Sequence, residues 1–305
     1  MHKVLVTTSS FGKMDHSPLN KLKENDFEVI LNPFGRKLGE QEVLDLVSEH
    51  QPTGLIAGVE PLTEAVMKSA PSLRVISRCG IGMDSVDLDA AKKIGITVAN
   101  TPDGPTIPVV ELTIGMILGL LRQIHVSDAS IRESAWERPM GGLLCGKTVG
   151  IIGCGRIGTR LAQTLQSFDC AVLGSDPAMP KSPYVQMVNL ERLLSASDII
   201  TLHLPYSSGT HHFMEAHRIS MMKKGAYLIN ASRGGLVDED ALVKALKNGR
   251  LAGAALDCFE HEPYQGPLKE LKNTLLTAHI GSYAREGRVM MENQAVDNLL
   301  SVLVQ

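Results

Sequence analysis

The chain has 305 residues, of which 44% are hydrophobic and 21% charged, and its formal net charge is −3. A chain of this length is long for one hydrophobic core, so we expect two domains. The small negative charge provides no broad cationic surface for nucleic acid or anionic lipid, and we expect neither partner. No apolar run is long enough to span a bilayer, and the N-terminus does not resemble a signal peptide.

The five cysteines of the chain are scattered and lack C-x-x-C spacing. They are Cys79, Cys145, Cys154, Cys170 and Cys258. Such usage is typical of reduced thiols in a cytosolic enzyme, so we expect a cytoplasmic protein.

Short apolar runs alternate with helix-like stretches in the first third of the chain. The pattern predicts strands at 4–7, 28–31, 54–57, 74–77 and 97–99, and helices at 40–50, 63–69 and 87–94. Alternation of this kind favours parallel strands with crossover helices on both faces. A Pro-rich stretch then leads into one long apolar helix, predicted from Ile107 to Ser130.

A second alternating series predicts strands at 148–152, 171–175, 198–203, 226–230, 251–256 and 274–277. The last helix, at 285–304, has no further sheet to join there, and we expect it to pack on the first domain. The fold class is therefore α/β, with two doubly wound parallel-sheet domains and the nucleotide-binding Rossmann domain inserted mid-chain. We assign 1–99 and 285–305 to a substrate-binding domain and 100–284 to an NAD-binding domain.

A glycine-rich turn follows the first strand of the second series. Gly153, Gly155 and Gly158 form a G-x-G-x-x-G pattern between an apolar strand and a helix start. The first glycine permits a tight turn, the second lets a pyrophosphate approach, and the third lets the helix pack on the strand. Asp176 closes the next strand, where an acid binds the ribose 2′-hydroxyl and repels a 2′-phosphate. The turn therefore predicts NAD(H) rather than NADP(H).

Three side chains that could carry chemistry follow successive strands of the second series. Arg233, Glu262 and His279 come after the fourth, fifth and sixth of these strands. Taken singly, each has an ordinary structural explanation as a surface arginine, a Glu-Pro turn or a hydrogen-bonding histidine. Together they are the set that hydride transfer needs: an imidazole to exchange the hydroxyl proton, a carboxylate to stabilise its cation, and a guanidinium to hold a carboxylate.

Metal-ligand spacing is absent from the histidine-containing segments. The residues His211, His212, His217 and His261 form no H-E-x-x-H pattern and are not paired with cysteines at zinc-site spacing. We therefore expect no metal site.

The sequence resembles the D-isomer-specific 2-hydroxyacid dehydrogenases over nearly its whole length. The motifs that carry this resemblance are Gly153–Gly158, Leu202–Pro205, Asn230–Asp238, Glu262–Pro263, His279–Gly281 and, earlier, Ser77–Asp87 and Asn100–Gly104. Within the family they are most similar to those of the phosphoglycerate dehydrogenases, which would place the chain in serine biosynthesis.

The resemblance implies roles for individual residues. It implies Arg233, Glu262 and His279 as the catalytic set and a homodimer built by the helix after Pro105. NAD-binding positions fall on Gly153, Gly155, Arg156, Ile157, Gly158, Asp176, Pro205, Thr210, Ala231 and Thr106, and on Asp257 at the nicotinamide end. Substrate-binding positions fall on Arg78, Cys79, Gly80 and Ile81, and on Arg138 supplied across a dimer.

The substrate stays open between several 2-hydroxy acids and their 2-oxo forms. The resemblance puts 3-phosphoglycerate and phosphohydroxypyruvate first, but Glu60 follows the third strand where those enzymes commonly carry a basic residue. Alternatives are a hydroxypyruvate or glyoxylate reductase, a sulfolactate-type enzyme, or an NAD-sensing corepressor-like protein. Glu262 argues against formate dehydrogenase, which has glutamine there. The sequence ends at Gln305 without the serine-sensing domain of many relatives, so we expect no serine feedback through it.

Overall fold

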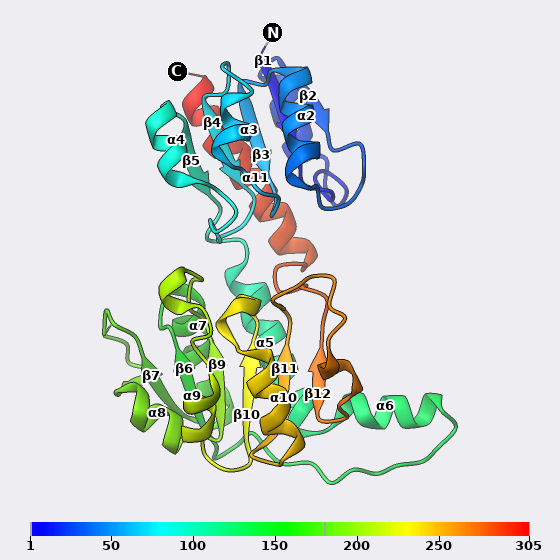
Figure 1. The fold of residues 1–305 in the computed structure, drawn as a ribbon, viewed down its shortest axis with the longest axis vertical. Coiled ribbons are helices and arrows are strands. Elements are labelled where there is room, and N and C mark those ends of the chain that lie inside the picture. Colours follow the sequence, from blue (N-terminus) through cyan, green and yellow to red (C-terminus); the bar gives the residue numbers. More distant parts are fainter. Residues whose placement is uncertain (1, 180, 305) are drawn as a thin grey trace. The chain divides into compact units, whose positions relative to one another are not determined.

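The computed structural model describes residues 2–179 and 181–304, and it divides the chain into two compact units (Figure 1). One unit comprises residues 1–105 and 282–305, and the other comprises residues 106–281. The predicted domain boundaries lay at 99 and 284, and residues 1 and 305 of the predicted ranges fall outside the described residues.

The first unit contains a five-stranded parallel sheet in the order β2-β1-β3-β4-β5. Its strands are β1 (His2–Val6), β2 (Phe27–Leu31), β3 (Gly54–Ala57), β4 (Val75–Arg78) and β5 (Thr97–Asn100). Its helices are α1 (Ser17–Glu24), α2 (Glu40–His50), α3 (Glu64–Lys68), α4 (Leu88–Ile94) and α11 (Arg285–Leu303). Helix α1 was not predicted, because it is short and buries only Pro18 and Leu22, which make too weak a pattern.

The last helix returns to the first unit, as predicted. Helix α11 packs against β3, β4, β5 and α1, and in Figure 1 it lies along the sheet. Met291, Val296 and Leu299 are fully buried in the same core cluster as Ile56 of β3. A Cβ at Gly54 would lie 2.7 Å from a methyl group of Leu299, so the absent side chain at this position lets the helix approach the strand.

The second unit contains a seven-stranded parallel sheet in the order β12-β11-β10-β9-β6-β7-β8. Its strands are β6 (Thr148–Ile152), β7 (Ala171–Ser175), β8 (Gln186–Met187), β9 (Ile199–Leu202), β10 (Ala226–Asn230), β11 (Leu251–Leu256) and β12 (Thr274–Leu276). Its longer helices are α5 (Thr106–Leu121), α6 (Ile124–Arg132), α7 (Arg156–Leu165), α8 (Leu190–Ala196), α9 (Ala216–Met221) and α10 (Glu239–Lys247).

Short 3₁₀ turns at Gln166–Phe168, Ser208–Thr210, Gly234–Leu236 and Pro267–Glu270 complete the second unit. The predicted α/β class and two doubly wound parallel sheets are confirmed. Among the described strands, the edge strand β8 was not predicted, because two residues give no alternating pattern. The strand order reverses between β6 and β9, which is where doubly wound sheets bind nucleotides.

The predicted single helix from 107 to 130 is wrong. The chain forms α5 and α6, whose axes meet at 68°, and Gln123 between them has a left-handed backbone with φ of 50°. Most apolar side chains of α5 pack inside the second unit. Val110, Met116, Ile117 and Leu120 are buried in a core shared with α7 and the sheet. Among the described residues no single helix has the length and hydropathy of a membrane span, and α5 with α6 reaches that composition only as a bent pair.

Candidate active site

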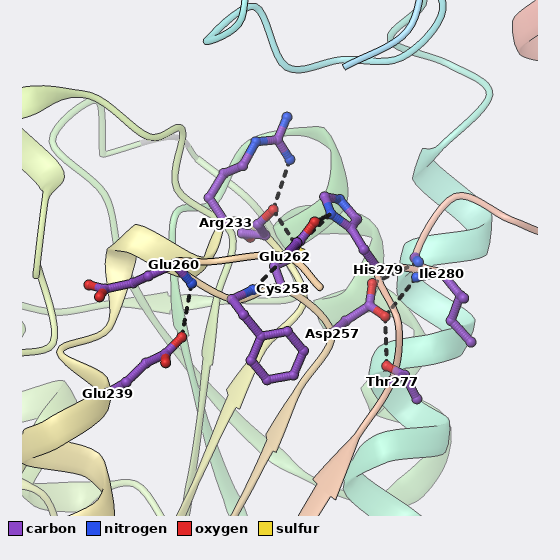
Figure 2. A network of polar contacts seen from close by, with 12 residues as sticks. Arg233, Glu239, Asp257, Cys258, Glu260, Glu262, Thr277, His279 and Ile280 are labelled. Carbon is purple, nitrogen blue, oxygen red and sulfur yellow. Dashed lines mark hydrogen bonds and ion pairs between the residues drawn. The ribbon is translucent and has the colours of Figure 1, made fainter. Parts of the chain in front are cut away.

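Arg233, Glu262 and His279 follow three neighbouring strands of the second sheet. Arg233 comes three residues after β10, Glu262 follows β11, and His279 follows β12. Because these strands are parallel and adjacent, their carboxyl ends meet at one edge of the sheet. Figure 2 shows the three side chains gathered at this edge.

His279 and Glu262 form a close pair. The Nδ1 atom of His279 lies 3.0 Å from each carboxylate oxygen of Glu262. One of these oxygens also accepts a hydrogen bond of 3.1 Å from the backbone N–H of Phe259, which fixes the carboxylate. An ionised carboxylate only accepts hydrogen bonds, so Nδ1 carries the proton and Nε2 is left to exchange a proton with a ligand. Both side chains are about one third exposed, at 36% and 32%.

The turn that carries His279 is anchored on the buried carboxylate of Asp257. This carboxylate accepts hydrogen bonds from the Thr277 hydroxyl at 2.6 Å, the Ile280 N–H at 2.8 Å and the Gly281 N–H at 2.7 Å. The backbone N–H of His279 donates to the Asp257 carbonyl at 2.8 Å. Since His279 has a left-handed backbone with φ of 53°, these contacts hold it in a conformation that an isolated chain seldom adopts.

A second buried polar residue, Asn230, holds the turn that carries Arg233. Its side-chain amide donates to the Arg233 carbonyl at 2.8 Å and accepts from the Ser232 N–H at 3.1 Å. The Ser232 hydroxyl in turn donates to the carbonyl of Leu202 on the neighbouring strand at 2.6 Å. The guanidinium of Arg233 donates to the Ser232 carbonyl at 2.8 Å, and the side chain is only partly buried. This arrangement leaves the arginine in reach of a ligand at the same edge as the His279–Glu262 pair (Figure 2).

The glycine turn after β6 has the local geometry that a phosphate-binding loop requires. Gly153 has φ of 92°, which an L-residue rarely adopts. A Cβ at Gly158 would lie 2.1 Å from the Gly153 carbonyl, so only glycine allows α7 to begin this close to the strand. A Cβ at Gly155 would meet nothing within 4 Å, which leaves open space at the N-terminus of α7. Helix N-termini attract phosphate groups through their unpaired N–H groups and dipole.

The remaining predicted cofactor positions lie in the same unit. Asp176 follows β7, and its carboxylate accepts hydrogen bonds of 2.8 Å from the N–H groups of Cys154 and Ala178. It is therefore held beside the glycine turn. The other positions are Arg156 and Ile157 on α7, Pro205 and Thr210 after β9, Ala231 after β10, and Thr106 at the start of α5.

His203 lies at the end of β9 and was not singled out from the sequence. Its Nε2 atom is 3.0 Å from the Thr201 hydroxyl, and its buried Nδ1 atom has no hydrogen-bond partner among the described residues. Burial lowers the pKa of His203 to about 4. A Cβ at Gly153 would lie 2.5 Å from the His203 carbonyl, so this strand end borders the glycine turn. The Leu-His-Leu-Pro motif was the signal that could have identified it.

The predicted substrate loop Arg78–Ile81 lies in the first unit, directly after β4. The guanidinium of Arg78 lies over Gly80 and donates a hydrogen bond to the Cys79 carbonyl. Arg78 is buried, with 6% of its surface exposed. Gly80 has φ of 144° and its N–H donates to the Thr101 hydroxyl at 2.7 Å. Burial raises the pKa of the Cys79 thiol to about 11, so it stays protonated.

A buried carboxylate occupies the position after β3 in the first unit. Glu60 is 1% exposed, bonds to the Thr7 hydroxyl, and accepts the Gly58 N–H at 2.8 Å. Arg138, the other predicted substrate residue, belongs to the second unit and is exposed on the segment after α6. The structure therefore brings the predicted catalytic set together within one unit, whereas the predicted substrate positions are divided between both units.

A comparison with protein families identifies the second unit. The family described as D-isomer specific 2-hydroxyacid dehydrogenase, NAD binding domain, matches residues 114–281. The chain belongs to this family. Its members are NAD-dependent oxidoreductases, and the match agrees with the predicted resemblance and with the predicted nicotinamide cofactor.

Individual relatives of this dehydrogenase family extend the match to the first unit. The chain is 43% identical to a glyoxylate reductase of Thermofilum pendens over 78% of this chain and 74% of that protein. It is 37% identical to a D-3-phosphoglycerate dehydrogenase of Methanocaldococcus jannaschii over 99% of this chain and 58% of that protein. The solved structure of the TT0316 protein from Thermus thermophilus matches with a TM-score of 0.91 and 38% identity, over 99% of this chain and 97% of that one.

The chain spans about half the length of the curated phosphoglycerate dehydrogenases that it matches. The curated relatives at 35–43% identity carry two different activity names, phosphoglycerate dehydrogenase and glyoxylate reductase. Membership of the 2-hydroxyacid dehydrogenase family therefore identifies the type of reaction but not which acid is the substrate.

Proposed function

We propose that this protein transfers hydride between NAD(H) and a D-2-hydroxy acid or its 2-oxo acid. The observation that carries the proposal is the His279–Glu262 pair, with 3.0 Å between imidazole nitrogen and carboxylate, beside Arg233 at the edge where the sheet of an NAD-binding domain ends. An imidazole held by a carboxylate is the group that donates a proton to a carbonyl oxygen as hydride arrives at the carbon.

Each of the three residues has a separate role in this proposal. The Nε2 atom of His279 gives its proton to the 2-oxo group during reduction and takes it back during oxidation. Glu262 keeps the imidazole oriented and stabilises its cation through Nδ1. Arg233 binds the substrate carboxylate by two parallel hydrogen bonds and polarises the oxygen next to it. Gly155 would hold the pyrophosphate of NAD and Asp176 its adenosine ribose, and the bound nicotinamide would accept hydride in oxidation and supply it in reduction.

Two classes of substrate have separate support. The names of the relatives and the arginine at position 78 favour 3-phosphoglycerate and phosphohydroxypyruvate. Glu60 favours the alternative, an unphosphorylated acid such as hydroxypyruvate or glyoxylate, because it stands after the third strand, where phosphoglycerate dehydrogenases commonly carry a basic residue. A glyoxylate reductase is also among the similar proteins.

We infer a homodimer as the working form. Large apolar side chains are exposed on α6 and on the segment that follows it, at Ile124, Ile131, Trp136, Met140 and Leu143. In Figure 1 α6 and this segment extend from the body of the second unit. Exposed apolar patches of this kind mark protein interfaces. We therefore propose an interface on α6 and the segment after it rather than on the buried α5 helix.

The test is a panel of 2-oxo acids with NADH, followed at the absorbance of the reduced nicotinamide. The panel contains phosphohydroxypyruvate, hydroxypyruvate, glyoxylate, pyruvate and sulfopyruvate. Turnover of phosphohydroxypyruvate with the highest kcat/KM supports the first substrate class, and turnover of an unphosphorylated acid supports the second. A folded, NADH-binding protein that turns over none of them would overturn the dehydrogenase proposal and favour a corepressor-like binding protein.

A further inference from the structure

Three potential metal ligands from two loops meet inside the candidate active site. The thiol of Cys258, the carboxylate of Glu262 and Nδ1 of His279 all lie within 4.8 Å of one another. Cys258 is 1% exposed and directly follows Asp257, while the other two side chains are partly exposed. Figure 2 shows Cys258 beside the His279–Glu262 pair.

The three groups are of the types that zinc binds, and the imidazole and carboxylate also have the spacing of a zinc site. Thiolate, imidazole and carboxylate are its usual ligands, with bonds of about 2.3 Å to sulfur and about 2.0 Å to nitrogen and oxygen. A tetrahedral zinc ion would separate its nitrogen and oxygen ligands by about 3.3 Å, and Nδ1 of His279 lies 3.0 Å from the Glu262 oxygens. The carboxylate is already fixed by the Phe259 N–H at 3.1 Å, so it needs no ordering to bind an ion.

We propose that Cys258, Glu262 and His279 form an inhibitory binding site for Zn²⁺ at the catalytic pair. Sγ of Cys258, one oxygen of Glu262 and Nδ1 of His279 replace water molecules of the hydrated ion, and all but one of its other water molecules leave. The protons of the thiol and of Nδ1 pass to solvent, and one water completes the tetrahedron. No oxidation or reduction occurs.

Zinc bound in this way removes the catalytic function of the pair. The ion takes the place of the Nδ1 proton, so Glu262 no longer stabilises an imidazolium and His279 no longer cycles between its two protonation states. Inhibition is the part of the inference that rests on the proposed dehydrogenase function. Binding of the ion does not rest on it, because the ligands are present whatever the reaction.

The other cysteines and the other histidine group provide the controls. Among the described residues Cys79 and Cys154 belong to no group of three potential metal ligands. Cys145 is exposed and is the competing thiol to exclude. His211, His212 and Glu260 form a second group with ligand spacing but contain no sulfur.

The test replaces zinc by Co²⁺, which gives an intense thiolate-to-metal absorption band in the near ultraviolet only when sulfur is a ligand. We expect the band in the unmodified protein and in Cys145→Ser, and its loss in Cys258→Ser. Cys258→Val serves as a second variant, and circular dichroism checks that each is folded. Absence of the band, its persistence without Cys258, or its loss in Cys145→Ser would overturn the proposal.

Zinc affinity and inhibition are measured on the same proteins. Competition with a chromophoric chelator should show weaker Zn²⁺ binding in Cys258→Ser, by about tenfold or more, because thiolate is the strongest of the three ligands. The Zn²⁺ concentration for half inhibition of NADH oxidation should rise by the same factor, and His212→Ala should leave it unchanged. Equal inhibition of Cys258→Ser and the unmodified protein, or relief by His212→Ala, would contradict the site. If no acid is turned over, the proposed function fails while the cobalt and chelator measurements still decide the metal site.

Discussion

Replacement of Asp257 by asparagine should disable the candidate active site without changing Arg233, Glu262 or His279. The Asp257 carboxylate is fully buried and accepts hydrogen bonds from Thr277, Ile280 and Gly281. An asparagine keeps one acceptor oxygen, but its NH₂ group faces a donor, so at least one buried N–H or O–H loses its partner. An unpaired buried donor costs about 1–3 kcal/mol, and the remaining bonds lose their charge assistance, so we expect a total of about 3–5 kcal/mol.

Urea unfolding and steady-state kinetics together measure this effect. Asp257→Asn should lower the free energy of unfolding with little change in its urea dependence, and kcat should fall more than KM for NADH rises, because the His279 turn loses its anchor. Asp198→Asn is the matched control, since that carboxylate accepts the Thr148 N–H at 2.9 Å at the opposite end of the sheet. It should lose stability but keep kcat. An Asp257→Asn protein with normal stability and kcat, or with an effect confined to KM for NADH, would refute the anchoring role.

Three further outcomes are expected. Arg233→Ala should abolish turnover, and Arg233→Lys should restore little of it, because an ammonium cannot make the paired hydrogen bonds to a carboxylate. The affinity for NADH, measured by fluorescence titration, should hardly change. Unchanged kcat and substrate KM would count against Arg233 as the residue that binds the substrate carboxylate. Asp176→Ala should narrow the preference of kcat/KM for NADH over NADPH, and equal efficiency in the unmodified protein would contradict the prediction. Burial lowers the pKa of His203 from 6.5 to about 4, so the folded state resists protonation of this imidazole. The free energy of unfolding should therefore decrease by up to about 3 kcal/mol as the pH falls from 6.5 to 4. His203→Gln should remove this part of the pH dependence of urea unfolding, and identical curves would show that His203 is not its source.

Hydrophobic periodicity predicted the sheet architecture well because both sheets are buried and parallel. Strands such as β6 and β10 are nearly continuous apolar runs, and their predicted bounds equal the observed ones. The helix break at Gln123 could not be predicted, since Leu121 and Ile124 are both apolar and the pattern continues across it. The break depends on the left-handed backbone of Gln123, after which α6 buries only Ser130.

The candidate catalytic residues could be identified from their types and their positions after strands, but the hydrogen bonds that hold their turns could not. The sequence indicates that Arg233, Glu262 and His279 follow neighbouring strands, whereas the roles of Asn230 and Asp257 as anchors depend on hydrogen bonds across turns. The grouping of Cys258 with Glu262 and His279 likewise depends on how two turns fold beside each other. Its ligands come from two loops, so no metal-binding spacing appears in the sequence.

The central claim is that His279 and Glu262 act as one proton-transfer unit. The measurement that tests it most directly is the pH dependence of 2-oxo acid reduction by the unmodified protein, Glu262→Gln and His279→Ala. We expect His279→Ala to lose about 10²–10⁴-fold in kcat, because no other group supplies the proton. Glu262→Gln should keep part of the activity with its pH profile moved to lower pH, because the imidazolium loses its carboxylate partner. A profile unchanged by Glu262→Gln, or near-normal turnover by His279→Ala, would contradict the account.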